Sequence, residues 1–516
     1  MQVTAGEVRA MLGDSKELAL LDLREELPFS ERHLLFARSM PLSRLELRMA
    51  QFVPRRATRI VLCDDGEGVA AIGAERLARY GYTNLALLAG GIAAWETAGF
   101  EIFSGVYVPS KAFGEFVEHT SGTPSVSAEE LNDMMRAGTD MVVLDSRPFD
   151  EFNRVSIPTG IDVPGAELVL RVHDLAPDPA TTIVVNCAGR TRSIIGAQSL
   201  RNAGVKNKVV ALRNGTMGWT LAGFTCAHGE TRSAGRPSGA ALTWAREAAA
   251  QVARRWGVGR VDAARLRDWQ EDGSRTTYLF DVRDPPEYAA GHFPGALPAP
   301  GGQLVQATDQ YVGTLGARIV LSDELEVRAA MTGSWLKQMG WQDVFILAES
   351  GSETAPPRPE ILGAVAPRET IDPARLEEMV KRDEAVVIDL SGSRAFREGH
   401  IEGAWFAIRS RLDRALAKIP PRGTVVLTSE DGVMAALAAP ELPGAKLLAG
   451  GNAAWVASGR ALARGEGNMA DEPIDTWLKP YERSSNQTAA MEQYLAWEID
   501  LVRKIERDGT TRFLRP

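Results

Sequence analysis

The feature that most constrains the fold of this chain is a unit that recurs four times. Each copy begins with a short apolar run that ends in an aspartate, namely Asp22, Asp145, Asp281 and Asp389. A second apolar run leads into a loop 42, 42, 42 and 40 residues after these aspartates, at Asp64, Cys187, Asp323 and Ser429. Because chance would not hold such spacings across four copies, the sequence predicts four tandem copies of one structural domain.

Each copy alternates short β-branched runs with helical stretches over about 100 residues. The apolar runs are hydrophobic on both faces, which is typical of strands buried between layers of helices. We therefore predict an α/β fold in which each unit is a small parallel sheet flanked by helices.

The composition of the connecting segments indicates where the domains end. Residues 228–240 and 350–367 are rich in Gly, Ser and Pro, as domain boundaries usually are. We predict domains over residues 1–105, 118–230, 255–350 and 368–465, with a helical extension over 466–516.

The C-terminal extension contains a predicted amphipathic helix over residues 488–507. Met491, Leu495, Ile499 and Val502 lie on one face of this helix, so we expect it to dock on a neighbouring domain. A solvated tail is the alternative.

Composition and charge exclude several classes of protein. The hydrophobic fraction is 45%, the net charge is −9 over 516 residues, and no Lys/Arg-rich block occurs. These values argue against a nucleic-acid or membrane partner, and no apolar stretch approaches the ~20 residues needed to span a bilayer. Three cysteines and the lack of a signal-peptide pattern fit a reducing compartment, so we expect a cytoplasmic location.

One loop carries a candidate nucleophile. Only the second copy has a cysteine at the loop position, in a loop expected to run from Cys187 through Arg192, with a helix beginning near Ser193. Inward-pointing backbone N–H groups, the positive end of that helix and two arginines would all favour the thiolate. We therefore predict Cys187 as the nucleophile, with a buried inert cysteine as the alternative.

The residues around Cys187 are candidate ligands of an anion, which the loop amides could hold. The predicted binding residues are Ala188, Gly189, Arg190, Thr191, Arg192, Ser193 and Arg147. Arg190 and Arg192 would bind that anion, unless they face water. Thr191 and Ser193 could donate to the sulfur, but helix capping is favoured. Arg147 could reach the loop, although arginines at the same place in copies 1 and 3 favour a structural bridge.

Several motifs together resemble the rhodanese (thiosulfate sulfurtransferase) family. They are the D-x-R turn at 145–147, the E-[FY] pairs at 151–152 and 287–288, the H-[FI]-x-G-A segments at 292–296 and 400–404, Cys187, and the G-x-x-x-W element at 215–219. They span about 400 of the 516 residues. The resemblance implies four rhodanese-like modules, each a doubly wound α/β sheet with its active loop at the C-terminal end of a central strand.

The resemblance also implies the reaction. The Cys187 thiolate attacks the sulfane sulfur of a donor such as thiosulfate and becomes a persulfide, and cyanide or a thiol then takes that sulfur in a ping-pong cycle. The expected partners are a small-molecule donor and acceptor. No metal or organic cofactor is needed, and the sequence has no CxxC or HExxH pattern.

The other three copies lack a loop nucleophile and carry acidic residues there, so we predict that they are inactive. His292 and His400 lie in such copies and are expected to be fold elements. Cys63 should be the buried last residue of its strand, and Cys226 as a second sulfur acceptor is a minor alternative. By analogy with two-module relatives, copy 1 is expected to cover the loop of copy 2, leaving copies 3 and 4 as a second pair.

Two other functions stay open. A phosphatase on this fold needs an arginine six residues after the cysteine, whereas Arg192 lies five after Cys187, so the loop is one residue too short. A non-enzymatic scaffold or a redox or persulfide sensor is the second alternative.

Overall fold

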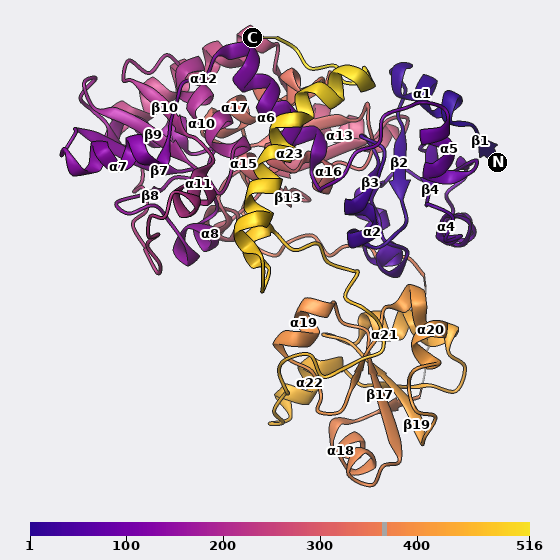
Figure 1. Ribbon diagram of the computed structural model, residues 1–516. Helices are drawn as coiled ribbons and strands as arrows, with labels where there is room; N and C mark the ends of the chain where they lie inside the picture. The colour runs from indigo at the N-terminus through magenta and orange to yellow at the C-terminus, as the bar shows by residue number, and fades with distance from the viewer. Residues whose placement is uncertain (364–368, 516) are drawn as a thin grey trace.

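The computed structural model describes residues 1–363 and 369–515, and it contains four sheets built from parallel strands (Figure 1). Helices flank each sheet, and a C-terminal helix follows the fourth sheet. The predicted α/β fold with four tandem units and a helical extension is confirmed. The boundary predicted at residue 368 and part of the linker over 350–367 lie outside the described residues, as does residue 516.

The sheet of module 1 has the strand order β1-β5-β4-β2-β3. Its strands are β1 (Gln2–Val3), β2 (Ala19–Asp22), β3 (Arg38–Ser39), β4 (Ile60–Cys63) and β5 (Leu85–Leu88). Its helices are α1 (Ala5–Gly13), α2 (Glu26–Glu31), α3 (Leu45–Phe52), α4 (Val69–Arg79) and α5 (Gly91–Thr97), with the 3-10 turn η1 (Leu42–Arg44). Strand β4, IVLC, is buried throughout, as a central parallel strand should be.

Module 2 repeats this order as β6-β10-β9-β7-β8 and is preceded by helix α6 (Val108–Ser121). Its strands are β6 (Ser125–Val126), β7 (Met141–Asp145), β8 (Ile161–Asp162), β9 (Thr182–Asn186) and β10 (Val209–Leu212). Its helices are α7 (Ala128–Arg136), α8 (Phe149–Arg154), α9 (Leu168–Leu175), α10 (Thr191–Asn202) and α11 (Gly215–Leu221).

Helix α12 (Gly239–Trp256) leads into module 3, whose strand order is β11-β15-β14-β12-β13. Its strands are β11 (Gly259–Arg260), β12 (Thr277–Asp281), β13 (Leu297–Pro298), β14 (Arg318–Ser322) and β15 (Val344–Leu347). Its helices are α13 (Ala263–Asp272), α14 (Pro285–Ala290), α15 (Gly301–Gln306), α16 (Thr308–Tyr311) and α17 (Val327–Gln338).

Module 4 has the strand order β16-β20-β19-β17-β18-β21. Its strands are β16 (Thr370–Ile371), β17 (Ala385–Asp389), β18 (Trp405–Phe406), β19 (Thr424–Thr428), β20 (Lys446–Leu448) and β21 (Asn468–Met469). Its helices are α18 (Pro373–Lys381), α19 (Ser393–Glu398), α20 (Leu412–Leu416), α21 (Val433–Ala438) and α22 (Gly451–Ala457), with 3-10 turns η2 (Arg409–Arg411) and η3 (Ala439–Glu441). The turn η4 (Pro480–Glu482) and helix α23 (Gln487–Asp508) complete the chain.

The strand register places the four loop residues at equivalent positions. In each module the last residue of the strand that ends in aspartate lies opposite the last residue of the central strand: Asp22 and Cys63, Asp145 and Asn186, Asp281 and Ser322, Asp389 and Thr428. The next residues are Asp64, Cys187, Asp323 and Ser429, so the spacing in the sequence identified the same structural position four times.

The expected pairing of the modules is wrong. Modules 2 and 3, with α6 and α12, share one continuous hydrophobic core that includes Phe113, Leu200 and Trp335. Modules 1 and 4 contact each other through a buried ion pair in which Arg409 Nη1 lies 2.7 Å from Glu46 Oε2. The analogy failed because it followed the order of the chain, whereas α12 turns module 3 back onto module 2 through its contacts with α9 and α17.

The C-terminal helix α23 docks as predicted, on α6 (Figure 1). Its buried residues are Ala490, Met491, Leu495, Glu498, Leu501, Ile505 and Asp508. Ile499 is 53% exposed, so the predicted face is wrong by part of a turn. The buried face passes through Glu498, a charged residue that an apolar stripe does not predict.

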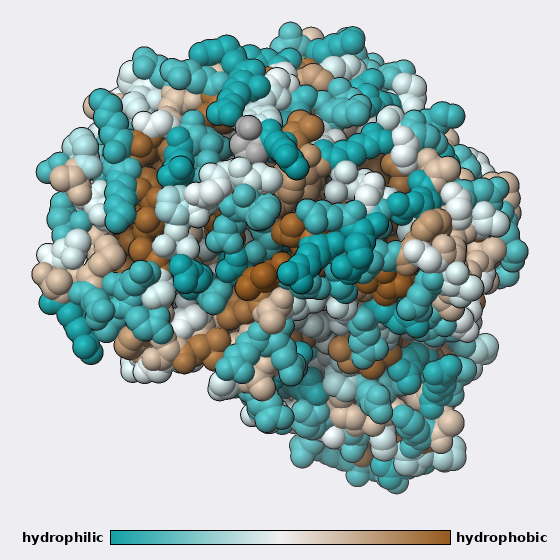
Figure 2. Space-filling model, turned by 45° about the horizontal axis from the view of Figure 1, so that its top comes forward, coloured by the Kyte–Doolittle hydropathy of each residue, from teal (hydrophilic) through white to brown (hydrophobic). Residues whose placement is uncertain are grey.

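The outer surface is mostly polar. Figure 2 shows hydrophilic side chains over most of one face, with apolar side chains in narrow strips between them. Of the helices that the structure describes, none has both the length and the apolar character that crossing a membrane requires.

Trp335 tests the shared core of modules 2 and 3. Its side chain is buried, and its indole N–H donates to Ser199 Oγ at 2.8 Å across the interface. We expect Trp335→Ala to lower the free energy of unfolding by about 3–5 kcal/mol in a denaturant titration. Phe149→Ala, at an aromatic that is 43% exposed, should cost less than about 1 kcal/mol. Equal losses in the two variants would contradict a shared core.

Candidate active site

Cys187 lies at the carboxyl end of the central strand of module 2. Strand β9 ends at Asn186 and α10 begins at Thr191, two residues before the predicted start. The Asn186 side-chain amide donates to Asp145 Oδ2 at 2.7 Å, which joins the ends of the two central strands. This is the edge of a parallel sheet at which ligand sites are usually found.

A cavity of about 50 Å³ opens at this loop. Cys187 is only 2% exposed, but it lines this cavity with Ala188, Gly189, Arg190, Thr191 and Arg192. Met217 of module 2 also lines the cavity. The other lining residues come from outside module 2, and they are Val106, Tyr107, Lys111, Gln306, Trp477, Lys479, Pro480, Tyr481, Tyr494 and Glu498. The loop therefore faces a small chamber closed by α6, module 3 and the C-terminal segment.

Arg190 is held by carboxylates of the helix α6. Its Nε and Nη2 donate to the two oxygens of Glu115, both at 2.7 Å, and it also pairs with Glu118. Burial by itself lowers the pKa of Arg190, but Glu115 and Glu118 raise it above its ordinary value. Its charge is therefore already compensated, and the predicted ligand role of Arg190 has a competing partner.

Arg192 has a similar partner within module 2. Its Nη2 donates to Glu151 Oε2 at 2.8 Å, and its Nη1 donates to Gln303 Oε1 of module 3 at 3.2 Å. Although burial alone raises the pKa of Glu151, the guanidinium of Arg192 helps to lower it to about 2. Glu151 is the acidic residue of the E-[FY] motif, so the motif holds this arginine in place.

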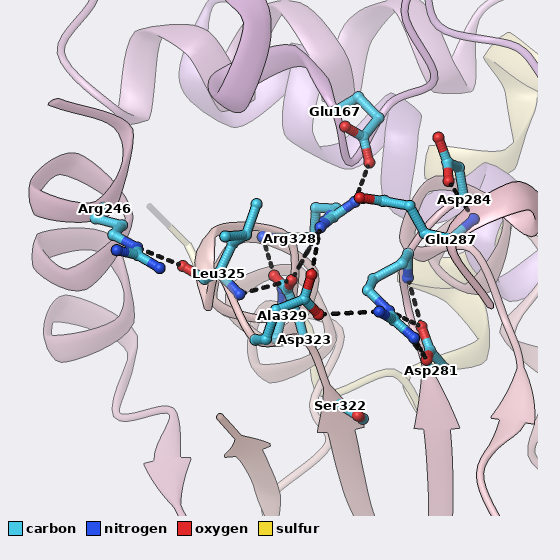
Figure 3. Close-up of polar contacts among 12 residues, drawn as sticks. Glu167, Arg246, Asp281, Asp284, Glu287, Ser322, Asp323, Leu325, Arg328 and Ala329 are labelled. Atoms are coloured by element: carbon cyan, nitrogen blue, oxygen red, sulfur yellow. Dashed lines mark hydrogen bonds and ion pairs between the residues drawn. The ribbon is translucent and has the colours of Figure 1, made fainter. Parts of the chain in front are cut away.

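Module 3 contains the same pair without a nucleophile (Figure 3). Arg328 lies five residues after Asp323, as Arg192 does after Cys187, and it pairs with Glu287 of the second E-[FY] motif. Arg328 also reaches Glu167 of module 2 at 3.0 Å. Because the arginine–glutamate pair recurs in a module that lacks cysteine, it favours a structural role for Arg192.

The hydroxyl groups of the loop do not cap the helix, so the capping interpretation is wrong. The Ser193 Oγ donates to the carbonyl oxygen of Arg190 at 2.8 Å. Thr191 Oγ1 is buried and has no hydrogen-bond partner in the described part of the chain. It lines the cavity beside Cys187 and is free to meet a ligand.

Arg147 forms a bridge within the D-x-R turn. Its Nε and Nη2 donate to the two oxygens of Asp145 at 2.8 and 2.7 Å, and Nη2 also donates to the Val155 carbonyl at 2.5 Å. Arg24 and Arg283 form the same clamp in modules 1 and 3. This geometry supports the structural bridge that the repeat favoured, and the role of Arg147 as a substrate ligand stays a prediction.

In modules 1, 3 and 4, the residue at the position of Cys187 accepts backbone N–H groups. Asp323 Oδ2 accepts N–H groups of Arg328 and Ala329 at 2.8 and 3.2 Å (Figure 3). Asp64 Oδ2 accepts the N–H of Ala70 at 2.9 Å, and Ser429 Oγ accepts that of Ala435 at 3.3 Å. In all three modules one donor lies six residues after the acceptor, in the first turn of the following helix. These amides have no partner inside the helix.

The remaining cysteines and histidines lie away from this chemistry. Cys63 ends β4, and burial raises the pKa of its thiol well above the usual range. Cys226 is half-buried beside Thr220, and burial raises its pKa too; it does not line the loop cavity. His292 and His400 stack on Tyr288 and Phe396 with ring centroids 3.9 and 4.0 Å apart, as expected of fold elements.

One group of carboxylates could in principle hold a metal ion. Oxygens of Glu167, Asp284 and Glu287 lie within 4.8 Å of one another. The Arg328 guanidinium already pairs with Glu167 and Glu287 (Figure 3), so an arginine occupies the place of a cation.

Sequence reasoning missed the residues that close the chamber. Lys111, Tyr494 and Glu498 lie on α6 and α23, outside the repeated units, so no spacing could align them with Cys187. The signal in the sequence was Glu498, a charged residue among the apolar residues of a helix that was expected to dock.

Comparison with known proteins identifies the family. The profile of the rhodanese-like domain matches residues 4–98, 127–222, 262–353 and 372–458. The chain belongs to the rhodanese family, as its motifs predicted.

Two similar proteins extend this result. The crystal structure of thiosulfate sulfurtransferase from Pseudomonas aeruginosa is 48% identical, covers 99% of each chain, and superposes with a TM-score of 0.95. A proposed sulfur carrier protein, YrkF of Bacillus subtilis (strain 168), is 25% identical over 126 residues, which are 22% of this chain and 66% of that protein.

The substitution Cys187→Asp tests whether loop amides surround position 187. If they do, the aspartate copies the arrangement of Asp64 and Asp323, and its ionised form is stabilised. At pH 7, Cys187→Asp should then be more stable than Cys187→Asn by about 1–3 kcal/mol in urea unfolding. A carboxyl group with a lowered pKa loses this advantage as the pH falls below about 4. An aspartate variant less stable than the asparagine variant at pH 7 would contradict the amide arrangement.

Proposed function

We propose that this protein moves a sulfane sulfur from a compact donor such as thiosulfate to a thiophilic acceptor through a persulfide on Cys187. A sulfurtransferase of the rhodanese type follows from the family and from the similarity to the Pseudomonas aeruginosa thiosulfate sulfurtransferase over the whole chain. The identity of the donor, the identity of the acceptor and the persulfide on Cys187 belong to our proposal.

The observation that carries the proposal is the bonding of the three silent loops. Each presents a first-turn N–H to the residue after the central strand, and that residue is an oxygen acceptor. The equivalent donor for Cys187 is the N–H of Ser193, six residues later. Amides aimed at sulfur favour the thiolate, which is the nucleophile.

The two half-reactions balance without a cofactor. The Cys187 thiolate forms a bond to the sulfane sulfur of thiosulfate, the sulfur–sulfur bond of the donor breaks, and sulfite leaves with the electron pair. Cyanide or a thiolate then bonds to the outer sulfur of the persulfide. Cys187 leaves as the thiolate and is ready for the next donor.

The alternatives have weaker support. A phosphatase would need an arginine free to bind phosphate, whereas the guanidinium of Arg192 is held by Glu151. A scaffold or sensor would need no chamber beside Cys187, yet three parts of the chain build one. A cytoplasmic location stays a prediction, in keeping with three free cysteines.

The proposal predicts which cysteine carries the activity. Cys187→Ser should reduce thiosulfate-dependent thiocyanate formation by at least about 10³-fold, since a hydroxyl in the same place is not ionised. Cys63→Ser and Cys226→Ser are the matched controls and should keep activity within a few fold. Full activity in Cys187→Ser, or hydrolysis of an aryl phosphate by the unmodified protein, would contradict the proposal.

A further inference from the structure

Glu498 is a buried carboxylate with one oxygen unused. It lies on α23, outside the four modules, and is only 1% exposed. Its Oε1 accepts hydrogen bonds from Lys111 Nζ and from the Tyr494 hydroxyl, both at 2.9 Å. Its Oε2 is buried and has no partner among residues 1–363 and 369–515. Burying an acceptor without a hydrogen bond is costly, so this oxygen is suited to a ligand.

The unused oxygen faces the Cys187 loop. A Cβ atom added to Gly189 would lie 3.3 Å from Glu498 Oε2 and 2.8 Å from the terminal carbon of Met217. Glu498 and Cys187 line the same cavity of about 50 Å³. A molecule with a sulfur atom at Cys187 and a hydrogen-bond donor a few bonds away would meet both groups.

The cations of the chamber are already paired. In the described part of the chain, Arg190 pairs with Glu115, Arg192 with Glu151, and Lys111 with Glu498. The Nζ atom of Lys479 lies 3.5 Å from Glu151 Oε1. Three oxygens of the lining have no partner among the described residues, namely Thr191 Oγ1, Gln306 Oε1 and Glu498 Oε2, and each can accept a hydrogen bond. Such a lining favours an acceptor molecule that carries a hydrogen-bond donor, and an ammonium group is the strongest donor to the carboxylate of Glu498.

We propose that Glu498 is a specificity-determining residue that selects a small aminothiol as the sulfur acceptor. This inference rests on the proposed function and names the acceptor class for the second half-reaction. The protonated amine donates to Glu498 Oε2 while the thiolate of the same molecule attacks the persulfide. A chamber of this size admits a molecule of a few heavy atoms.

The transfer step balances as follows. The acceptor thiolate bonds to the outer sulfur of the protonated Cys187 persulfide, and the bond from Cys187 Sγ to that sulfur breaks. The electron pair stays on Sγ as the thiolate, and the outer sulfur leaves with its proton as the aminothiol persulfide. Glu498 holds the amine and takes no proton.

Two matched acceptors test the assignment. 2-Aminoethanethiol and 1-propanethiol have the same number of heavy atoms, and only the first presents an ammonium group. The full-length protein is first loaded with thiosulfate, and sulfite release in a single turnover measures the persulfide. The KM and kcat for each acceptor are then determined at a fixed pH, expressed per thiolate concentration because the ammonium group lowers the pKa of the thiol, and referred to the loaded fraction.

We expect the KM of the unmodified protein for 2-aminoethanethiol to be about tenfold below that for 1-propanethiol, since a charge-assisted hydrogen bond accounts for a factor of that order. Glu498→Gln should raise the KM for 2-aminoethanethiol about tenfold, with less change in kcat, and leave the KM for 1-propanethiol unchanged. Glu492→Gln, which makes the same change at an exposed position of α23, should keep the preference.

The outcomes separate this inference from the proposed function. No sulfite release from the unmodified protein would contradict the Cys187 persulfide itself. Normal loading with equal KM values for the two thiols would overturn the role of Glu498, and this comparison needs no variant. Normal loading with a preference that survives in Glu498→Gln would overturn it as well.

Discussion

The structure depends on how the unpaired amides at the start of one helix are satisfied. In each module the central strand ends, a short loop follows and a helix begins, and in modules 1, 3 and 4 a first-turn N–H of that helix donates to the residue after the strand. First-turn N–H groups have no acceptor inside their helix, so burial demands an acceptor from elsewhere. Asp64, Asp323 and Ser429 supply oxygen atoms for this purpose. In module 2 the same place is taken by Cys187.

This constraint connects module 2 to the three modules without a loop cysteine. An aspartate at the loop position satisfies the helix but has no nucleophilic sulfur. In the function that we propose, Cys187 meets the same requirement through its sulfur, so the feature that stabilises the fold also positions the nucleophile. Module 3 contributes by packing, because Gln303 and Gln306 lie against the loop of module 2. The C-terminal segment contributes Trp477 and Tyr481 to the wall of the chamber.

The sequence predicted the features that recur in all four copies and missed the contacts that occur in only one copy. Fixed spacings aligned Cys187 with Asp64 and Asp323, and buried β-branched runs predicted the parallel sheets. The partners of Arg190 and Arg192 could not be found this way. Glu115 lies on a helix between modules, and a charged side chain in a loop is equally compatible with solvent, substrate or an ion pair. The pairing of modules 2 and 3 depends on surfaces that differ from copy to copy. Glu498 was overlooked because burial of a single carboxylate depends on Lys111, nearly 400 residues away.

The central claim is that the Sγ atom of Cys187 receives the sulfane sulfur. Intact-protein and peptide mass spectrometry after incubation with thiosulfate, under conditions that preserve persulfides, tests it most directly. The account predicts the mass of one added sulfur on the peptide that contains Cys187, its removal by cyanide, and no such gain on the peptides that contain Cys63 or Cys226. An unmodified Cys187 peptide in a protein that still releases sulfite, or added sulfur on another cysteine, would contradict it.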